Sequence, residues 1–220
     1  MKFSSLVPSV IAAAGVAVAM SSFNPADAAF VKFSATPFTG DNAEVDFLLE
    51  EVGNDVKFTV TVDSNVNSGG DLRGVWFNIA NDSLLNLDID KMGSNIPEIQ
   101  QSAGNVNDLG NGANLNGGGP NNPGSFDIGL EIGTQGASPD FIPSTMFTVK
   151  NIGLDQFLGQ KFAARVGSVG SNQNGSSKLS AVAPTEAEPV PEPLTILGSA
   201  TALGIGGLLK RQQSKKNNKA

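Results

Sequence analysis

Apolar and polar residues alternate along several short segments in the middle of the chain, the pattern of β-strands with one buried face. The clearest segment is 56–62, where the valines and Phe58 share one face while the threonines and Lys57 share the other. A second segment, 72–79, has two apolar faces, one with Val75, Phe77 and Ile79 and the other with Leu72 and Trp76. Trp76 lies among apolar neighbours, so we expect it in the core.

Further segments fit the same period, and helical patterns are nearly absent. The predicted strands are 44–49 (as the first strand), 126–132, 146–149, 162–169 and 179–182. A single helical turn is expected over 154–159, with Asp155 near its start. Many short strands separated by Gly, Asn, Pro and Ser predict an antiparallel β-sandwich over residues 30–182. The uneven strand spacing favours a jelly-roll or cohesin-like arrangement over an immunoglobulin one.

Two connections stand out between these strands. The stretch Asp63 to Gly70 is expected to form a hairpin connection. The longer stretch 102–124 is rich in Gly and Asn. Connections of this length are usually either functional or disordered, and the small number of large apolar side chains favours disorder.

The first 28 residues have the layout of a signal peptide. Lys2 precedes a largely apolar run, and Ala26-Asp27-Ala28 places small residues at the −3 and −1 positions of a cleavage site after Ala28. Such a segment predicts export, and an uncleaved membrane anchor is the alternative, which the short apolar run and the Ala-x-Ala pattern disfavour.

The C-terminus combines a linker, a motif, an apolar span and a basic end. Residues 183–190 are rich in Pro, Ala and Glu, as in a disordered linker. Val190-Pro191-Glu192-Pro193 follows, then the uncharged run 194–209, then Lys210 and Arg211. At about 1.5 Å per residue the run spans roughly 24 Å, slightly short of a hydrocarbon core of about 30 Å. The basic end is expected to stay cytoplasmic, with the middle of the chain outside.

This ordered tail, residues 190–216, resembles the PEP-CTERM sorting segment of diderm bacteria, and is also similar to the C-terminal segment named for ice-binding proteins. The resemblance implies a transient membrane anchor that an exosortase, a membrane protease, cuts near the motif. A permanent single-span anchor is the alternative. The expected location is an inner-membrane intermediate, then the cell surface or the medium.

The stretch from Phe126 to Val182 resembles domains of other PEP-CTERM proteins. The motifs that carry this resemblance are Asp127-Ile128-Gly129, Ile132-Gly133-Thr134-Gln135-Gly136, Arg165-Val166-Gly167-Ser168-Val169-Gly170 and Gly175-Ser176-Ser177-Lys178-Leu179. The resemblance implies an exported envelope protein and assigns no catalytic residue.

Composition narrows the chemistry. The absence of Cys and His excludes disulfides, thiolate or imidazole metal sites, and Ser-His-Asp triads. Residues 30–190 hold eight basic and 19 acidic residues, a formal charge of about −11. This charge repels phosphate backbones, so we expect no nucleic-acid partner.

Calcium is the one cofactor that the residues suggest. Asp63, Asn65, Asn67 and Asp71 begin like an EF-hand loop, but Gly74 stands where the bidentate Glu is required. A looser site, from this loop or from Asp82, Asp88 and Asp90, is the alternative to solvated turn residues that bond their own backbone.

We therefore expect a non-enzymatic structural or adhesive protein that contacts extracellular polysaccharide. The alternatives are a Ca²⁺- or carbohydrate-binding module and a carboxylate-based glycan hydrolase. A Ser177-Lys178 nucleophile pair is disfavoured, because adjacent side chains of a strand point to opposite faces.

Overall fold

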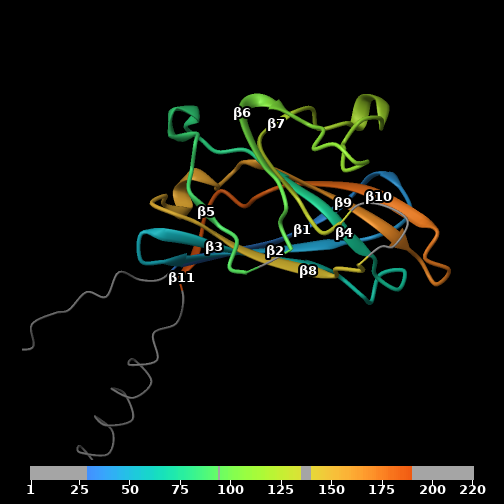
Figure 1. The fold of residues 1–220 in the computed structure, drawn as a ribbon. Coiled ribbons are helices and arrows are strands. Elements are labelled where there is room, and N and C mark those ends of the chain that lie inside the picture. The colour runs from blue at the N-terminus through green and yellow to red at the C-terminus, as the bar shows by residue number, and fades with distance from the viewer. Residues whose placement is uncertain (1–28, 94, 135–139, 190–220) are drawn as a thin grey trace, which may run out of the picture.

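The computed structural model describes residues 29–93, 95–134 and 140–189 as an all-β chain with one curled antiparallel sheet (Figure 1). Three short 3₁₀ turns interrupt it. The strands are β1 (Ala29–Gly40), β2 (Val45–Val52), β3 (Asp55–Val62), β4 (Asp71–Phe77), β5 (Ile89–Asp90), β6 (Ile99–Val106), β7 (Phe126–Glu131), β8 (Ser144–Val149), β9 (Lys161–Val169), β10 (Gly175–Val182) and β11 (Glu188–Pro189). The turns are η1 (Asp82–Leu84), η2 (Gly119–Asn121) and η3 (Leu154–Gln156).

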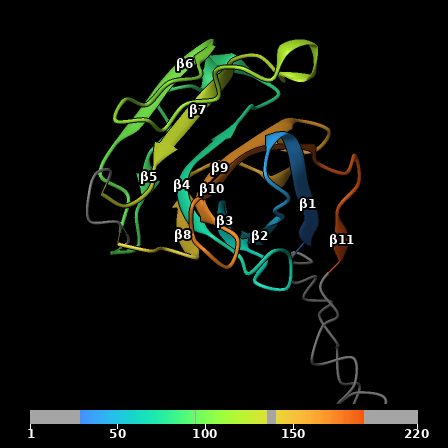
Figure 2. The ribbon, with the colours of Figure 1, turned by 90° about the vertical axis from the view of Figure 1, so that its right-hand side faces the viewer.

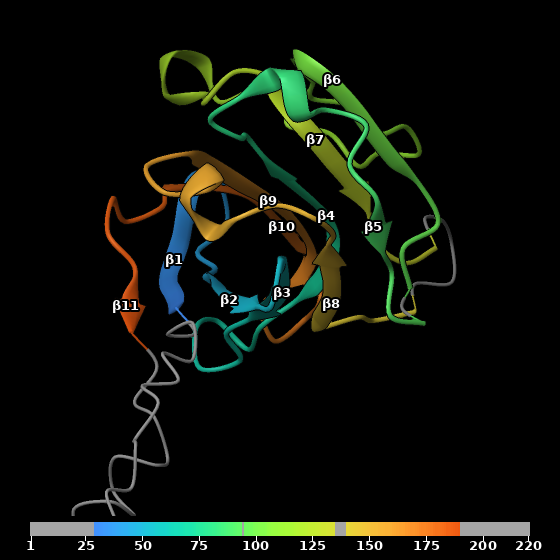
Figure 3. The ribbon, with the colours of Figure 1, turned by 90° about the vertical axis from the view of Figure 1, so that its left-hand side faces the viewer.

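Strand β1 joins the two halves of the sheet. The order along the sheet is β5-β8-β3-β2-β1-β10-β9-β4-β7-β6. Residues 30–35 of β1 pair with β2, whereas residues 36–40 pair with β10. We call β5-β8-β3-β2 the first half-sheet and β10-β9-β4-β7-β6 the second. Figure 3 shows the sheet curling from one half into the other.

A phenylalanine cluster fills the space inside the curl. Phe58 of β3 lies 4.6 Å from Phe147 of β8 and 5.1 Å from Phe77 of β4, between ring centroids. Phe162 of β9 lies 5.4 Å from Phe47 of β2. These contacts join the two half-sheets, so the alternating apolar faces of both halves form one core.

Most strands lie where the alternation predicts them, but the first strand does not. The chain enters the sheet at Ala29, well before residues 44–49, which form part of β2. The sequence of β1 hides this strand because its alternation breaks where it changes partner. Pro37, which cannot donate to a ladder, lies at this change, beside a register shift.

The alternation predicts that Leu72 and Trp76 share one face of β4, opposite Val75 and Phe77. This prediction is confirmed for Trp76 and wrong for Leu72. Leu72 packs in the main core with Val75 and Phe77. A bulge between Leu72 and Gly74 shifts the register against β9, so the alternation changes phase at that point. Trp76 is fully buried, as expected, but it belongs to a separate cluster on the other face of the sheet.

The connection from Asp63 to Gly70 is not a hairpin. It follows β3, which pairs with β2 and β8, and leads into β4, which pairs with β7 and β9. The segment therefore carries the chain from the first half-sheet to the second.

The described end of the chain returns to its described beginning. Residues 183–189, expected as a linker, lie against the domain, with Ala183 buried. In the pair β11–β1, Ala29 is opposite Pro189 and Phe30 is opposite Glu188. The two ends thus leave the domain side by side.

The expected signal peptide and the sorting tail from Val190 onward lie outside the described residues. Within the described ranges, no helix is long and apolar enough to cross a bilayer.

Candidate functional site

The outer face of the second half-sheet is covered by the Gly/Asn-rich segment, which we call the flap (residues 107–124). Figures 1 and 2 show it at the top of the domain, next to β6 and β7, with β9 and β10 below it. Trp76 and Ala163 from the sheet are buried beneath it, together with Leu109, Ala113 and Leu115 from the flap itself. The expectation of disorder for 102–124 is therefore wrong, because three apolar side chains of the flap gather over one tryptophan.

Asparagine side chains replace a regular ladder inside the flap. Asn122 Nδ2 donates to the Leu115 carbonyl over 2.9 Å, and the Gly110 amide donates to Asp108 Oδ1 over 2.9 Å. Lys178 of β10 donates to Asn114 Oδ1 over 3.1 Å and also to the Asn116 carbonyl. The residues that suggested disorder thus supply the hydrogen bonds that order the segment.

The Asp127-Ile128-Gly129 motif holds the base of the flap. Asp127 Oδ1 accepts from the Gly104 amide over 2.7 Å, and Oδ2 accepts from the Ile79 amide over 3.1 Å. A Cβ on Gly129 would lie 2.8 Å from Val106 of β6 and 2.9 Å from Leu109 of the flap. The close approach of the flap to β7 therefore explains why an aspartate and a glycine occupy positions 127 and 129.

The four calcium candidates do not converge. Asp63 Oδ1 accepts from the backbone and side-chain amides of Asn65, each over 2.8 Å, as a turn residue bonded locally. Asn67 donates to the Asn42 carbonyl. Asp71 is fully buried and lies apart from this turn, with its carboxylate held by Ile142 and Arg73. In the described ranges, no group of three acidic side chains could hold a metal ion.

Asp71 nevertheless has an unusual environment. Its Oδ1 accepts from the Ile142 amide over 2.8 Å, and its Oδ2 lies 2.7 Å from Arg73 Nε. Burial raises the pKa of the Asp71 carboxyl, while the amide hydrogen bond and Arg73 act in the opposite direction. The pair fixes the loop before β8 to the start of β4 and is a structural link.

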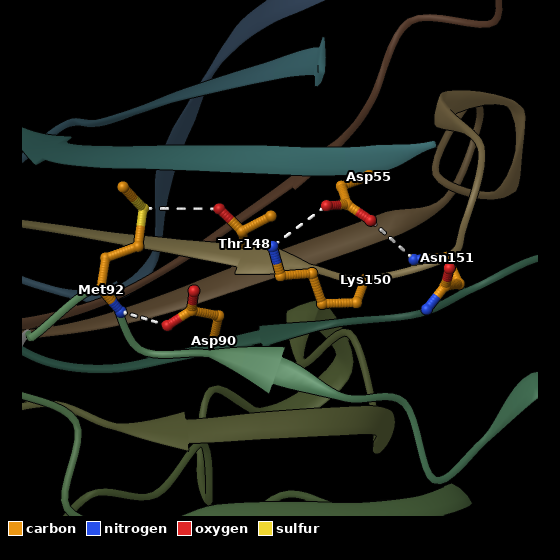
Figure 4. A network of polar contacts seen from close by, with 6 residues as sticks. All are labelled: Asp55, Asp90, Met92, Thr148, Lys150 and Asn151. Atoms are coloured by element: carbon orange, nitrogen blue, oxygen red, sulfur yellow. Dashed lines mark hydrogen bonds and ion pairs between the residues drawn. The ribbon is translucent and has the colours of Figure 1, made fainter. Parts of the chain in front are cut away.

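Lys150 lies between two acidic residues, Asp55 of β3 and Asp90 of β5 (Figure 4). Lys150 Nζ lies 3.0 Å from Asp55 Oδ2, and the Asn151 amide donates to Asp55 Oδ1 over 2.9 Å. The hydrogen bond to Asp55 raises the pKa of Lys150, against a smaller effect of burial, and the charges of Asp90 and Asp88 add to the increase. The ammonium group of Lys150 is thus the partner of the Asp55 carboxylate.

The same close-up shows how the loop after β5 is held. Asp90 Oδ1 accepts from the Met92 amide over 3.0 Å, which leaves this carboxylate as a turn cap. Thr148 Oγ1 donates to Met92 Sδ over 3.4 Å. These contacts make the group a structural network.

Ser177 and Lys178 lie on opposite faces of β10. Ser177 is fully buried toward the core, whereas Lys178 reaches the flap. This arrangement separates the hydroxyl from the amine, so the pair cannot act as nucleophile and base. The sorting residues Val190, Pro191, Glu192 and Pro193, and the basic pair Lys210 and Arg211, lie outside the described residues.

Two hollows open beside the loop that precedes β6. One, of about 260 Å³, is lined by Asn95, Gly133 and Asp140 among others. The other, of about 430 Å³, shares Asn95 and has the exposed Met92 and Met146 at its rim. Their described linings bring one carboxylate, from Asp140, and no matched pair for acid–base chemistry.

The candidate functional surface is the outer face of the second half-sheet, where the flap and Lys178 meet. Sequence reasoning missed this face, because register brings together residues that are far apart along the chain. No family model matches the chain, nor does any curated protein or solved structure.

Proposed function

We propose that this chain is an exported, non-enzymatic protein of the cell surface or extracellular matrix, with a structural or adhesive role. Its described part is a β-sandwich of jelly-roll or cohesin-like type. A signal peptide (1–28) directs export. A PEP-CTERM-type tail (190–216) anchors the chain in the membrane until an exosortase-type protease removes it.

The observation that supports this proposal most is the pairing of β11 with β1. Ala29, the first residue after the proposed signal-peptide cleavage, is opposite Pro189, which lies just before the proposed sorting motif. The two proposed cuts therefore lie next to the same pair of strands, β1 and β11.

The pairing also has a geometric consequence for the anchored intermediate. Strand β11 lies at the lower left of the domain in Figure 1, whereas the flap lies at the upper right. A membrane segment that follows Pro189 directly would thus hold the flap on the side away from the bilayer. There the flap face is accessible to matrix polysaccharide before release.

The test is the intact mass of the protein recovered from the medium and from the membrane fraction of its native host. We expect a released form that begins at Ala29 and ends near residue 190. Replacing Pro191, Glu192 and Pro193 by alanine should keep the chain in the membrane fraction. Replacing Glu186 and Glu188 by alanine changes the charge nearby without touching the motif, and should leave release unchanged. A full-length tail on the released protein would refute the proposal.

A further inference from the structure

Three basic side chains lie in a row across the outer face of the second half-sheet. Lys178 of β10 is directly opposite Arg165 of β9 in the ladder. Arg73 lies at the bulge of β4, on the other side of Arg165, with its Nε 3.3 Å from where a Cβ on Gly167 would be. We call these three residues the basic row. They are three of only eight basic residues within the acidic stretch 30–190.

The basic row destabilises the folded domain when no ligand is bound, because its cations repel one another and are partly buried. Like charges directly opposite one another in a ladder destabilise a sheet. Burial lowers the pKa of Arg165, and the charge of Arg73 lowers it further. Burial also lowers the pKa of Lys178, and Arg165 adds to the effect, while Asp108 opposes it. Both cations thus lose solvation and face a positive neighbour.

Within the described ranges, no acidic or hydrogen-bonding group offsets the partly buried charge of Arg165. No hydrogen bond or ion pair of its guanidinium is found among residues 29–93, 95–134 and 140–189. Arg73, in contrast, is paired with Asp71, and Lys178 donates to neutral oxygens of Asn114 and Asn116. A half-buried guanidinium without a counterion, between two other cations, is the arrangement of an anion site.

We propose that the basic row binds the anionic groups of an acidic polysaccharide, with Arg165 as the central contact. A guanidinium presents a planar fork that suits the two oxygens of a carboxylate or sulfate group. An anion there would relieve the repulsion between Arg165 and Lys178. The inference rests on the proposed function and specifies the polysaccharide that this face contacts.

The length of the basic row and the charge of the domain indicate which kind of anionic ligand fits best. Neighbouring strands are about 4.8 Å apart, so three strands place the cations over roughly 10 Å. This span exceeds one carboxylate and fits a polymer that presents several anions along its length. The surrounding charge of about −11 repels any polyanion at long range and repels densely charged ones, such as nucleic acid, most strongly, so it favours a polysaccharide with widely spaced anions.

The test is calorimetric titration of the purified full chain, kept in a non-ionic detergent, with four polymers. Polygalacturonate presents carboxylates, dextran sulfate presents sulfates, dextran is neutral, and single-stranded DNA presents phosphates. We expect saturable binding of polygalacturonate, dextran sulfate or both, which also identifies the anion, and none of dextran. Saturable binding of neither acidic polysaccharide overturns the proposal, as does tighter binding of DNA than of both.

Arg165→Gln is the decisive variant and Lys32→Gln is its matched control. Lys32 is an exposed base of β1 in the part that pairs with β2, so its loss changes net charge equally. Arg165→Gln should weaken binding by about tenfold or more, as expected for a lost hydrogen bond to a charged group. Lys32→Gln should change it less than twofold. Equal affinities of the two variants overturn the proposal.

A second measurement separates binding from folding. Without ligand, Arg165→Gln should melt at the same temperature as the parent or above it, because the variant removes the repulsion with Lys178. Arg165→Lys keeps the charge but loses the fork, and should bind between the parent and Arg165→Gln. A lowered melting temperature in Arg165→Gln would assign the row a structural role and overturn the proposal. These titrations use purified protein, so their failure leaves export and tail removal untouched.

Discussion

The packing of the flap over Trp76 can be tested by truncating Leu115. This side chain is 1% exposed and belongs to the cluster beneath the flap. A buried Leu→Ala change costs about 2–5 kcal/mol. With a urea dependence of about 2 kcal/mol per M, Leu115→Ala should lower the unfolding midpoint by about 1–2.5 M. A disordered flap would instead give no measurable change.

The assay is selective because Trp76 is the only tryptophan and the chain has no tyrosine. Emission excited at 295 nm therefore reports the flap cluster, while far-ultraviolet circular dichroism reports the sheet. If the flap opens as a unit of its own, the fluorescence transition should precede the dichroism transition in Leu115→Ala. Leu84→Ala, at a 39% exposed site in η1, is the matched control and should leave both transitions in place.

The reasoning would be refuted by a midpoint shift equivalent to less than about 0.5 kcal/mol, the range of ordinary surface substitutions. Unchanged acrylamide quenching of Trp76 in Leu115→Ala would count against it in the same way, because an opened flap admits the quencher to the ring.

Three further variants test the remaining contacts. The Asn151 amide holds the pKa of Asp55 below its ordinary value of 3.8, so this stabilisation is present above that pH and is lost as the pH falls through the folded pKa. Asp55→Asn should therefore flatten the decline of melting temperature below about pH 4, and an equally steep decline would contradict this. Ser177 buries a hydroxyl with no hydrogen-bond partner in the described chain, so Ser177→Ala should stabilise by about 1 kcal/mol in urea titrations, and a loss of that size would argue against it. Gly74→Ala places a Cβ 2.6 Å from the Trp76 ring and should cost about 1–3 kcal/mol with a shifted emission maximum, whereas parental stability would mean that the ring can move away.

The alternation of apolar and polar residues predicted the strands that have one face on the phenylalanine core. It located β3 from the valines beside Phe58, since a period of two is direct evidence of a half-buried strand. It failed for β1, where the partner changes near Pro37, and for β6, an edge strand with little buried surface. Apolar and polar residues alternate only where one face of a strand is regularly buried. Strands that are irregularly or hardly buried therefore show no clear alternation.

The flap and the basic row were beyond sequence reasoning for a different reason. Composition suggested disorder for residues 102–124, because it counts apolar side chains and ignores where they gather. Lys178 and Arg165 face each other only through the register of β9 and β10. The spacing of Asp63 and Asp71 suggested a calcium loop, but the crossover between the half-sheets takes them to different surroundings.

The position of β1 in the sheet has a consequence for how the chain folds. The strand is the first of the described chain to be synthesised, yet Thr36 must pair with Ser180 of β10. The sheet cannot be completed until nearly all described residues have been made, and such a high contact order is typical of folding in milliseconds to seconds. Unpaired strands remain open to other copies during that interval. Keeping nascent chains apart until β10 and β11 are available would therefore favour correct folding.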